Sequence, residues 1–260
     1  MPEIEEVSIN RMIEIAKQAG VETMTIYNRN FSVEEKEDYT PVTEADEKAN
    51  DQITKALKKH YPDIPIISEE TKEVAYEERE HWNRFWLVDP LDGTKEFIKK
   101  NGEFTINIAL VENGKPAMGV VYLPAKQEMY YGIVGEGAYK AEAGDKGQPL
   151  RPGPHYSAKD RVSVVASRSH LTQEVDDFVK ELENKGKEVD FTSAGSSLKF
   201  CLVAEGSADV YPRFGPTMEW DTGAAQAVAE AAGKQVLDAT SGEPLTYNKE
   251  DLHNPWFIVE

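Results

Sequence analysis

The sequence predicts a layered fold of the α+β or α/β class. Three features of the chain support this prediction: two amphipathic helical patterns near its start, strand patterns separated by turn residues in its middle, and alternating strand and helix patterns from residue 161 onward. A chain of 260 residues, 40% of them apolar, can bury a sizeable core. We therefore expect one large domain or two small lobes.

The N-terminal part of the chain predicts two helices. Residues 8–19 carry apolar side chains at helical spacing and precede Gly20, which commonly ends a helix. A second apolar stripe runs from Ala45 to about His60, and Thr43 stands where a helix cap is expected. Asp46 would then lie in the first turn, where the helix dipole favours a carboxylate, so capping alone would explain this acid.

The middle of the chain predicts strands. The short apolar runs 64–68 and 85–89 each end in acidic residues, as expected for buried strands that open onto a polar site. An antiparallel meander follows, with a turn at 112–115 and strand patterns at 104–110, 117–123 and 128–133. The charged run 77–80 reads most simply as a solvated loop or helix face.

The stretch 143–159 is rich in Gly, Pro and polar residues, which predicts a connection between two lobes. Residues 1–145 would form an α+β lobe with the antiparallel sheet, and residues 146–260 an α/β lobe. The second lobe should alternate strands at 161–166, 188–192 and 208–211 with helices at 171–184, 196–205 and 219–232.

Composition excludes several classes of function. A single cysteine, Cys201, excludes an intramolecular disulfide and a Cys-based zinc site, and its helical setting suggests a small core residue. No basic segment followed by an apolar run opens the chain, and no run approaches the roughly 18 apolar residues of a membrane span. We therefore expect a cytoplasmic protein with at most peripheral membrane contact. The net charge of −18 argues against a nucleic acid polymer as a partner.

The strongest chemical signal is Asp89-Pro90-Leu91-Asp92-Gly93-Thr94, at the end of an apolar strand. The two carboxylates and the Leu91 carbonyl can converge on hard cations, which prefer oxygen ligands. Gly93 permits a tight turn, and the free N–H groups of a helix that begins there could bind a phosphate. The alternative is an Asp-rich turn without a ligand.

Acids in other segments strengthen the metal interpretation. Glu69 and Glu70 end another apolar strand, and Asp221 begins an Ala-rich helix. Each could be an ordinary solvated or helix-end acid. Together with Asp46, however, they supply enough oxygen ligands for two or three magnesium ions. These cations would also offset the repulsion between an acidic protein and a phosphorylated metabolite, so we expect a magnesium-dependent phosphomonoesterase.

At these residues the chain resembles the inositol monophosphatase superfamily of lithium-sensitive, magnesium-dependent phosphatases. The segments 93–98, 102–110, 195–201 and 208–217 are similar, more specifically, to its bacterial 3'(2'),5'-bisphosphate nucleotidases. The resemblance implies the sugar phosphatase fold, with alternating α-β-α-β-α layers. It also implies that the N-terminal lobe supplies most metal ligands, and the C-terminal lobe one ligand and the substrate contacts.

Carried over by matching position, the resemblance implies a role for each site residue. Asp46 and Thr94 would orient and activate the attacking water. The implied metal ligands are Glu69, Asp89, the Leu91 carbonyl, Asp92 and Asp221. The implied substrate contacts are Gly93, Thr94, Ser196, Lys199 and Arg213. For Lys199 and Arg213, a helix-surface lysine and a strand-end arginine are the alternative.

The leading hypothesis is hydrolysis of adenosine 3',5'-bisphosphate to AMP and phosphate, with two or three Mg²⁺ ions and inhibition by Li⁺. One alternative is an inositol monophosphatase or fructose-1,6-bisphosphatase of the same fold. A second is a cation- or nucleotide-binding module without catalysis. The sequence leaves the choice between monomer and homodimer open.

Overall fold

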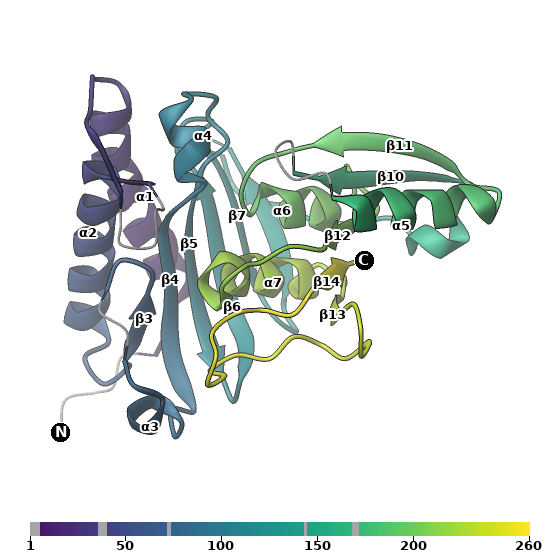
Figure 1. Cartoon of the computed structure of the whole chain (residues 1–260). Coiled ribbons are helices and arrows are strands. Elements are labelled where there is room, and N and C mark those ends of the chain that lie inside the picture. The colour runs from purple at the N-terminus through teal and green to yellow at the C-terminus, as the bar shows by residue number, and fades with distance from the viewer. Residues whose placement is uncertain (1–5, 36–40, 72–73, 143–144, 168–171) are drawn as a thin grey trace.

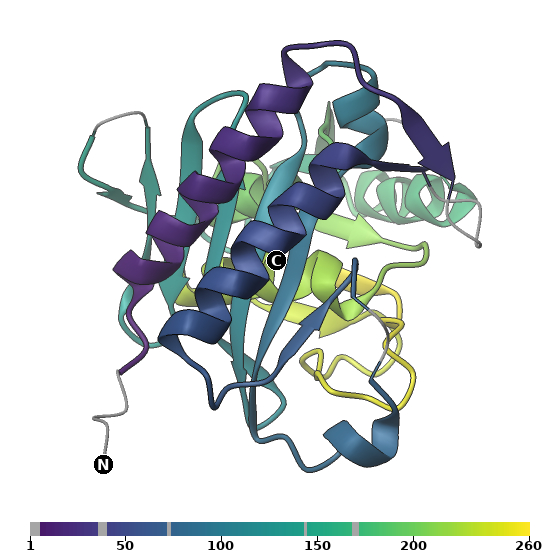
Figure 2. The same cartoon turned by 90° about the vertical axis from the view of Figure 1, so that its left-hand side faces the viewer.

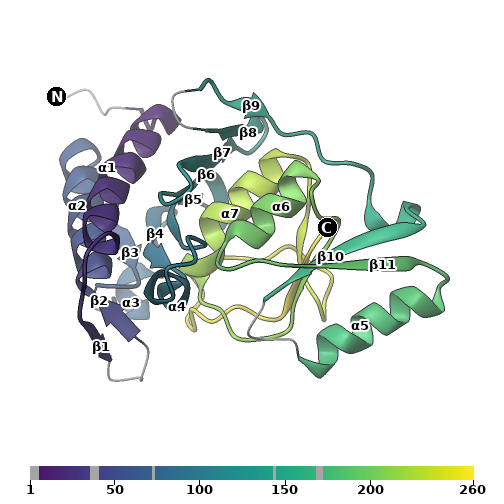
Figure 3. The ribbon, with the colours of Figure 1, turned by 90° about the horizontal axis from the view of Figure 1, so that it is seen from above.

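The computed structural model describes residues 6–35, 41–71, 74–142, 145–167 and 172–260. Helices and sheets alternate in layers across the molecule, as Figures 1 and 3 show. Helices α1 (Ile9–Tyr27) and α2 (Glu44–His60) cover one face of the main sheet, and α6 (Leu198–Glu205) and α7 (Glu219–Ala231) cover the other. Beyond them lie β10 (Arg161–Ala166), β11 (Glu188–Ser193) and, outermost, α5 (Gln173–Asn184). The layered fold predicted from the sequence is confirmed.

The main sheet contains seven strands in the order β3-β4-β5-β6-β7-β8-β9. Only β3 and β4 run parallel, and each later pair is antiparallel. The strands are β3 (Ile66–Ser68), β4 (Arg84–Asp92), β5 (Thr105–Glu112), β6 (Lys115–Leu123), β7 (Glu128–Ile133), β8 (Gly137–Ala141) and β9 (Gln148–Pro149). The predicted meander is therefore confirmed, and β8 and β9 extend it beyond the prediction.

Helices α1 and α2 lie side by side on one face of this sheet (Figure 2). Helix α2 begins as predicted, because the Thr43 hydroxyl accepts a hydrogen bond from the Ala45 N–H at 3.1 Å. The prediction that Gly20 ends α1 is wrong, since the helix continues to Tyr27. A side chain at position 20 would collide with the Tyr122 ring, so Gly20 allows close packing of the helix on the sheet.

In the C-terminal part, β10 and β11 are parallel, and β12 (Tyr211–Arg213), β14 (Phe257–Val259) and β13 (Val236–Asp238) form an antiparallel sheet. The predicted helices and the strands expected at 161–166 and 188–192 appear close to their expected limits, although Leu171, the expected start of one helix, lies outside the described residues. The strand expected at 208–211 begins only at Tyr211. Strands β13 and β14 were not predicted. Cys201 is fully buried in α6, as expected of a core residue.

Helix α7 packs closely on the main sheet. A side chain at Gly119 in β6 would collide with the Ala224 carbonyl of α7, and the largest apolar cluster joins Leu87 and Val121 of the sheet with Val228 of the helix. The core therefore includes residues from both sides of position 145. The division into lobes 1–145 and 146–260 remains a proposal.

Short elements complete the fold. They are β1 (Val33–Glu35), β2 (Pro41–Thr43), α3 (Tyr76–Arg79), α4 (Thr94–Ile98) and the 3₁₀ helix η1 (Tyr156–Ala158). The interpretation of residues 77–80 as solvated is wrong at Arg79, which is buried and donates hydrogen bonds to the Lys249 and Glu250 carbonyls. None of the helices in the described ranges is long and apolar enough to cross a membrane.

Candidate active site

The two aspartates at the end of β4 face one cavity because the strand is irregular there. Between Asp89 and Asp92, three steps along β4 correspond to two along β5, from Asn107 to Thr105. In a regular strand, residues three positions apart point to opposite faces, and one extra residue reverses this. Asp89 and Asp92 therefore both line the same cavity.

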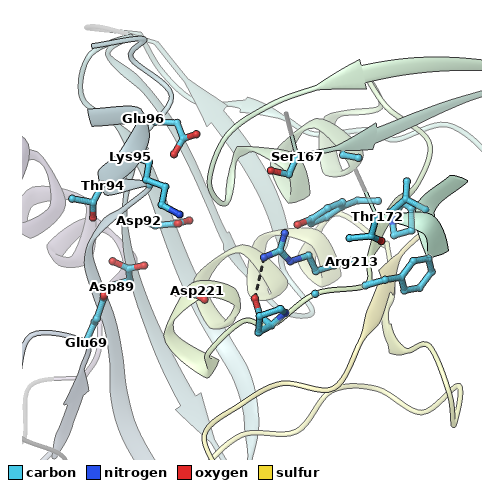
Figure 4. A pocket seen from close by; sticks show the side chains of 18 of the residues that line it. Glu69, Asp89, Asp92, Thr94, Lys95, Glu96, Ser167, Thr172, Arg213 and Asp221 are labelled. Atoms are coloured by element: carbon cyan, nitrogen blue, oxygen red, sulfur yellow. Dashed lines mark hydrogen bonds between the residues drawn. The ribbon is translucent and has the colours of Figure 1, made fainter. Parts of the chain in front are cut away.

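This cavity has a volume of about 590 Å³ and lies between the end of the main sheet and the C-terminal part of the chain (Figure 4). Carboxylates from three separate segments meet at one end of it. All five predicted metal ligands line it: Glu69, Asp89, Leu91, Asp92 and Asp221. Gly93, Thr94 and Arg213 line it as well.

Burial and mutual repulsion disfavour the charged forms of these acids. Burial, followed by the nearby charges of Glu69, Asp92 and Asp221, raises the pKa of Asp89 well above its ordinary value. Burial and then Asp92 raise the pKa of Asp221 to about 8. In the described part of the chain, Asp89, Asp92 and Asp221 form no ion pair with a basic side chain. A buried cluster of this kind is costly unless cations offset its charge.

Each of the three aspartates has one oxygen fixed by hydrogen bonds. Asp89 Oδ1 accepts from the Leu91 N–H at 3.0 Å, and Asp221 Oδ2 from the Met218 N–H at 2.8 Å. Asp92 Oδ2 accepts from the Ser197 N–H at 2.6 Å and from the Ser197 hydroxyl at 2.7 Å. The other oxygen of each carboxylate makes no hydrogen bond to a described residue, and is thus available as a ligand.

This donor set fits magnesium. Among the described residues, no group of three or more His, Cys, Asp or Glu side chains is placed to hold a metal ion by itself. Mg²⁺ is usually bound by only one or two carboxylates and completes its shell with water and substrate phosphate. Carboxylate oxygens that line a cavity open to both of these ligands suit that mode of binding.

Asp46 and Thr94 are hydrogen-bonded to each other at the edge of the cavity. The Thr94 hydroxyl donates to Asp46 Oδ1 at 3.2 Å, while Asp46 Oδ2 accepts from the Thr43 N–H at 2.8 Å and the Thr43 hydroxyl at 2.7 Å. Burial raises the pKa of Asp46, and the hydrogen bonds from Thr43 oppose this. Asp46 therefore both caps α2 and contacts Thr94, one role for each oxygen.

Lys199 is buried at the base of a smaller adjoining cavity of about 170 Å³, which Ser196 and Arg213 also line. It is 6% exposed, so the alternative of a helix-surface lysine is wrong. Its ammonium donates to the Ser196 carbonyl at 2.6 Å, and burial lowers its pKa to about 8. Ser196 donates its own hydroxyl to the Glu103 carbonyl, while Arg213 donates to the Pro216 carbonyl at 2.9 Å.

Several residues of the site were assigned no role from the sequence. Ser197 and Asn107 hold Asp92, and Lys95 lines both cavities without an ion pair in the described part of the structure. Val175 and Phe214 form part of an apolar wall. Lys95 belongs to the segment 93–98, whose similarity to the nucleotidases was noted from the sequence without a contact being assigned to it. The wall residues come from separate segments, and no pattern in the sequence marks them.

Comparison with known proteins identifies relatives that agree with one another in family. Residues 5–255 match the inositol monophosphatase family. The 3'(2'),5'-bisphosphate nucleotidase CysQ of Salmonella typhimurium is 47% identical over 258 residues, which cover 96% of this chain and 98% of that protein. The protein of the same name from Escherichia coli K12 is 46% identical, with the same coverage.

Solved structures agree with these matches. The crystal structure of CysQ from Bacteroides thetaiotaomicron, described as a bacterial member of the inositol monophosphatase family, has a TM-score of 0.85 and 48% sequence identity, and covers 96% of each chain. The suhB protein of Bartonella henselae has a TM-score of 0.77 and 27% identity, and covers 96% of this chain and 92% of its own.

Proposed function

Because the chain belongs to the inositol monophosphatase family, we propose that it is a phosphatase that hydrolyses the 3'-phosphate of adenosine 3',5'-bisphosphate to AMP and phosphate. One observation carries this proposal. A cluster of buried carboxylates adjoins a cavity lined by Lys199 and Arg213. The site thus places basic side chains beside the carboxylate cluster, and relatives that are 46–47% identical to this chain are named bisphosphate nucleotidases.

A bisphosphate nucleotide complements both regions. We assign the phosphate that is hydrolysed to the region of Glu69, Asp89, Asp92 and Asp221, where magnesium would offset the negative charge. We assign the second phosphate to the region of Lys199 and Arg213, with Ser196 beside them. A sugar monophosphate would leave the second region unused. This difference favours a bisphosphate over inositol monophosphate, and the relatives named bisphosphate nucleotidases favour the nucleotide over fructose 1,6-bisphosphate.

The proposed reaction is in-line attack of water on phosphorus, with cleavage of the bond to the ribose 3'-oxygen. When bound by Glu69, Asp89, the Leu91 carbonyl, Asp92 and Asp221, two or three Mg²⁺ ions would lower the pKa of the attacking water and offset the phosphate charge. The Thr94 hydroxyl donates a hydrogen bond to Asp46, so a lone pair of its oxygen is free to accept a hydrogen bond from the water and orient it. Asp46, whose pKa burial raises, can accept a proton through this hydrogen bond.

Gly93 and the N-terminal turn of α4 contribute to phosphate binding in this proposal. Gly93 has φ 90°, in the left-handed region that favours glycine, and an added Cβ would lie 3.2 Å from the Ser196 Cβ. The backbone can therefore approach a ligand closely at this position. Thr94, the first residue of α4, would then contact both the water and the phosphate.

The test is phosphate release from adenosine 3',5'-bisphosphate, inositol 1-phosphate and fructose 1,6-bisphosphate, each with Mg²⁺, with EDTA and with added Li⁺. We expect the nucleotide to have the highest kcat/KM, with no activity in EDTA and inhibition by Li⁺. Preference for either sugar phosphate would favour the alternative phosphatases. No release from any substrate, although the nucleotide binds, would favour a non-catalytic binding module.

We further propose that the protein acts in the cytoplasm, as a monomer or homodimer, on a phosphorylated nucleotide and not on a nucleic acid polymer. The net charge of −18 and the absence of a disulfide partner for Cys201 support this setting. Any contact with a membrane would be peripheral in this proposal. Fractionation of cells and sedimentation of the purified protein would test location and oligomeric state.

A further inference from the structure

A separate cavity lies at the end of helix α7 opposite Asp221. Its volume is about 610 Å³, and residues after β9 and between α7 and β13 line it. Helix α7 contains 13 residues, so about 20 Å separates this cavity from the catalytic carboxylates along the helix axis. The lining includes Leu150, Arg151, Pro152, His155, Lys234 and Glu260. The carboxylate chemistry of the catalytic site does not involve these residues.

Lys234 has an unusual environment in this cavity. It is only 8% exposed, yet its ammonium group makes no hydrogen bond or ion pair with any residue in the described ranges. Burial lowers its pKa; the carboxylates of Asp209 and Glu260 oppose this shift, and the charge of Lys159 adds to it. Removing an ammonium group from water without giving it a partner is costly. A ligand that enters the cavity would supply the missing partner.

The two acids nearest to Lys234 have other partners. Asp209 pairs with Lys159 and also accepts from the Ser163 N–H at 2.9 Å. Glu260 interacts with the Tyr156 hydroxyl, and it lies 3.2 Å from the Nε2 atom of His155, with which it forms an ion pair when the imidazole is protonated. Both nearby acids are therefore engaged.

Arg151 also lines the cavity, is exposed, and has no hydrogen bond or ion pair within the part of the chain that the structure describes. Two cations without acidic partners thus share one cavity in a chain whose net charge is −18. Non-specific attraction by the whole protein cannot account for anion binding here, so any such binding would be local.

We propose that this cavity binds a small tetrahedral oxyanion, of the phosphate or sulfate type, between Lys234 and Arg151. Such an anion would accept charge-assisted hydrogen bonds from both side chains. A simpler role for Lys234 is to offset the negative end of the α7 dipole. That role predicts a change in stability on mutation but no effect of an added oxyanion.

The test uses thermal unfolding in EDTA, where the unneutralised carboxylates of the catalytic site repel anions. Inorganic phosphate, inorganic sulfate and glycerol 3-phosphate are each added at the ionic strength of a sodium chloride control. At tenfold excess over Kd, we expect phosphate to raise Tm by about 2 to 4 °C. A response to glycerol 3-phosphate alone would identify a phosphate ester as the ligand, and a response to the inorganic anions would identify a free oxyanion.

Matched variants locate the binding. Lys234→Met and Arg151→Gln should each abolish the shift, while Lys199→Met at the catalytic site and the exposed Lys59→Met, which removes the same charge, should retain it. If Lys234→Met does not fold, Arg151→Gln decides alone. The proposal would be wrong if none of the three anions raised Tm above the sodium chloride control. It would also be wrong if the rise in Tm were lost only in Lys199→Met. Because the test involves no turnover, it is independent of the proposed phosphatase activity.

Discussion

Lys199 occupies a position that favours ligand binding over stability. Its ammonium is buried beside the cavities, close to Asp92, Glu96 and Glu103 but also to Arg213. The net effect lowers its pKa from 10.5 to about 8, which corresponds to about 3 kcal/mol against the charged form. An anion bound beside it would offset this cost. The free-energy cost of burying this ammonium group is consistent with a functional role for Lys199.

We expect Lys199→Met to stabilise the protein at pH 7, by up to about 3 kcal/mol. Between pH 8 and 10.5 the unfolded wild type binds more protons than the folded state, so wild-type stability rises with pH in this range, and the advantage of the variant should disappear. Urea unfolding in EDTA at pH 7, 8, 9 and 10 measures this. A variant that is less stable at pH 7, or a difference independent of pH, would contradict the assignment; Lys59→Met is the charge control.

The same substitution should separate binding from chemistry. If Lys199 contacts the second phosphate, Lys199→Met should raise KM for adenosine 3',5'-bisphosphate about 10- to 100-fold, since a charge-assisted hydrogen bond contributes about 1.5–3 kcal/mol. For adenosine 3'-monophosphate, which lacks the second phosphate, the rise in KM should be much smaller. Steady-state kinetics with both nucleotides measure the difference. An equal loss for both substrates would assign Lys199 to a structural role.

At the scale of elements, two local devices place the reactive groups. The extra residue in β4 between Asp89 and Asp92 turns both carboxylates to one cavity. The cap of α2 fixes Asp46 through Thr43 and so directs its other oxygen to Thr94. A helix start and a strand irregularity, each common in proteins, thus contribute directly to the geometry of the site.

We expect Thr43→Ala to affect both stability and activity. Loss of the cap should cost about 1 kcal/mol, and the loss of one hydrogen bond to Asp46 should lower kcat more than it changes KM. Thr43→Ser, which keeps the hydroxyl, should restore both. Thr25→Ala, on the exposed side of α1, is the control and should be nearly neutral in urea unfolding and in kinetics. A normal kcat in Thr43→Ala would show that the hydroxyl of Thr43 does not support Asp46.

At the scale of the whole molecule, the carboxylate cluster joins separate parts of the chain. Glu69 follows β3, Asp89 and Asp92 end β4, and Asp221 lies in the first turn of α7. Their mutual repulsion opposes the packing of α7 on the sheet, although the apolar core holds these elements together. Cations bound between them would therefore stabilise the fold as well as the transition state.

Removal of divalent cations should therefore lower stability. We expect Mg²⁺ at tenfold excess over Kd to raise Tm by about 2 to 4 °C relative to EDTA, because it binds only the folded state. Asp89→Asn should lose most of this response and more than about 100-fold in activity, while its Tm in EDTA should be at least that of the wild type, since repulsion is reduced. Thermal unfolding with and without Mg²⁺ measures both. A full Mg²⁺ response in Asp89→Asn would remove Asp89 from the proposed ligand set.

Much of the fold follows from local patterns. The apolar spacing of α2, its cap at Thr43 and the strands of the meander were all predicted, because periodicity and turn residues act over short distances. The prediction that Gly20 ends a helix was wrong. Glycine is needed there because the Tyr122 ring, which is distant in the sequence, packs against this position. Strands β8 and β9 were missed because they contain only five and two residues, and because they form by pairing with β7 and β8, respectively.

For the site, the sequence by itself determined which acids could act together and to which family the chain belongs, because the motif around Asp89 and Asp92 is local and specific. Only the tertiary structure decided that Lys199 is buried, that Ser197 holds Asp92, and that Lys234 lines a second cavity. Burial and electrostatic environment depend on segments that meet only after folding. The physical reason is that the sequence specifies the type of each side chain, whereas its exposure to solvent and its neighbours depend on how the whole molecule packs.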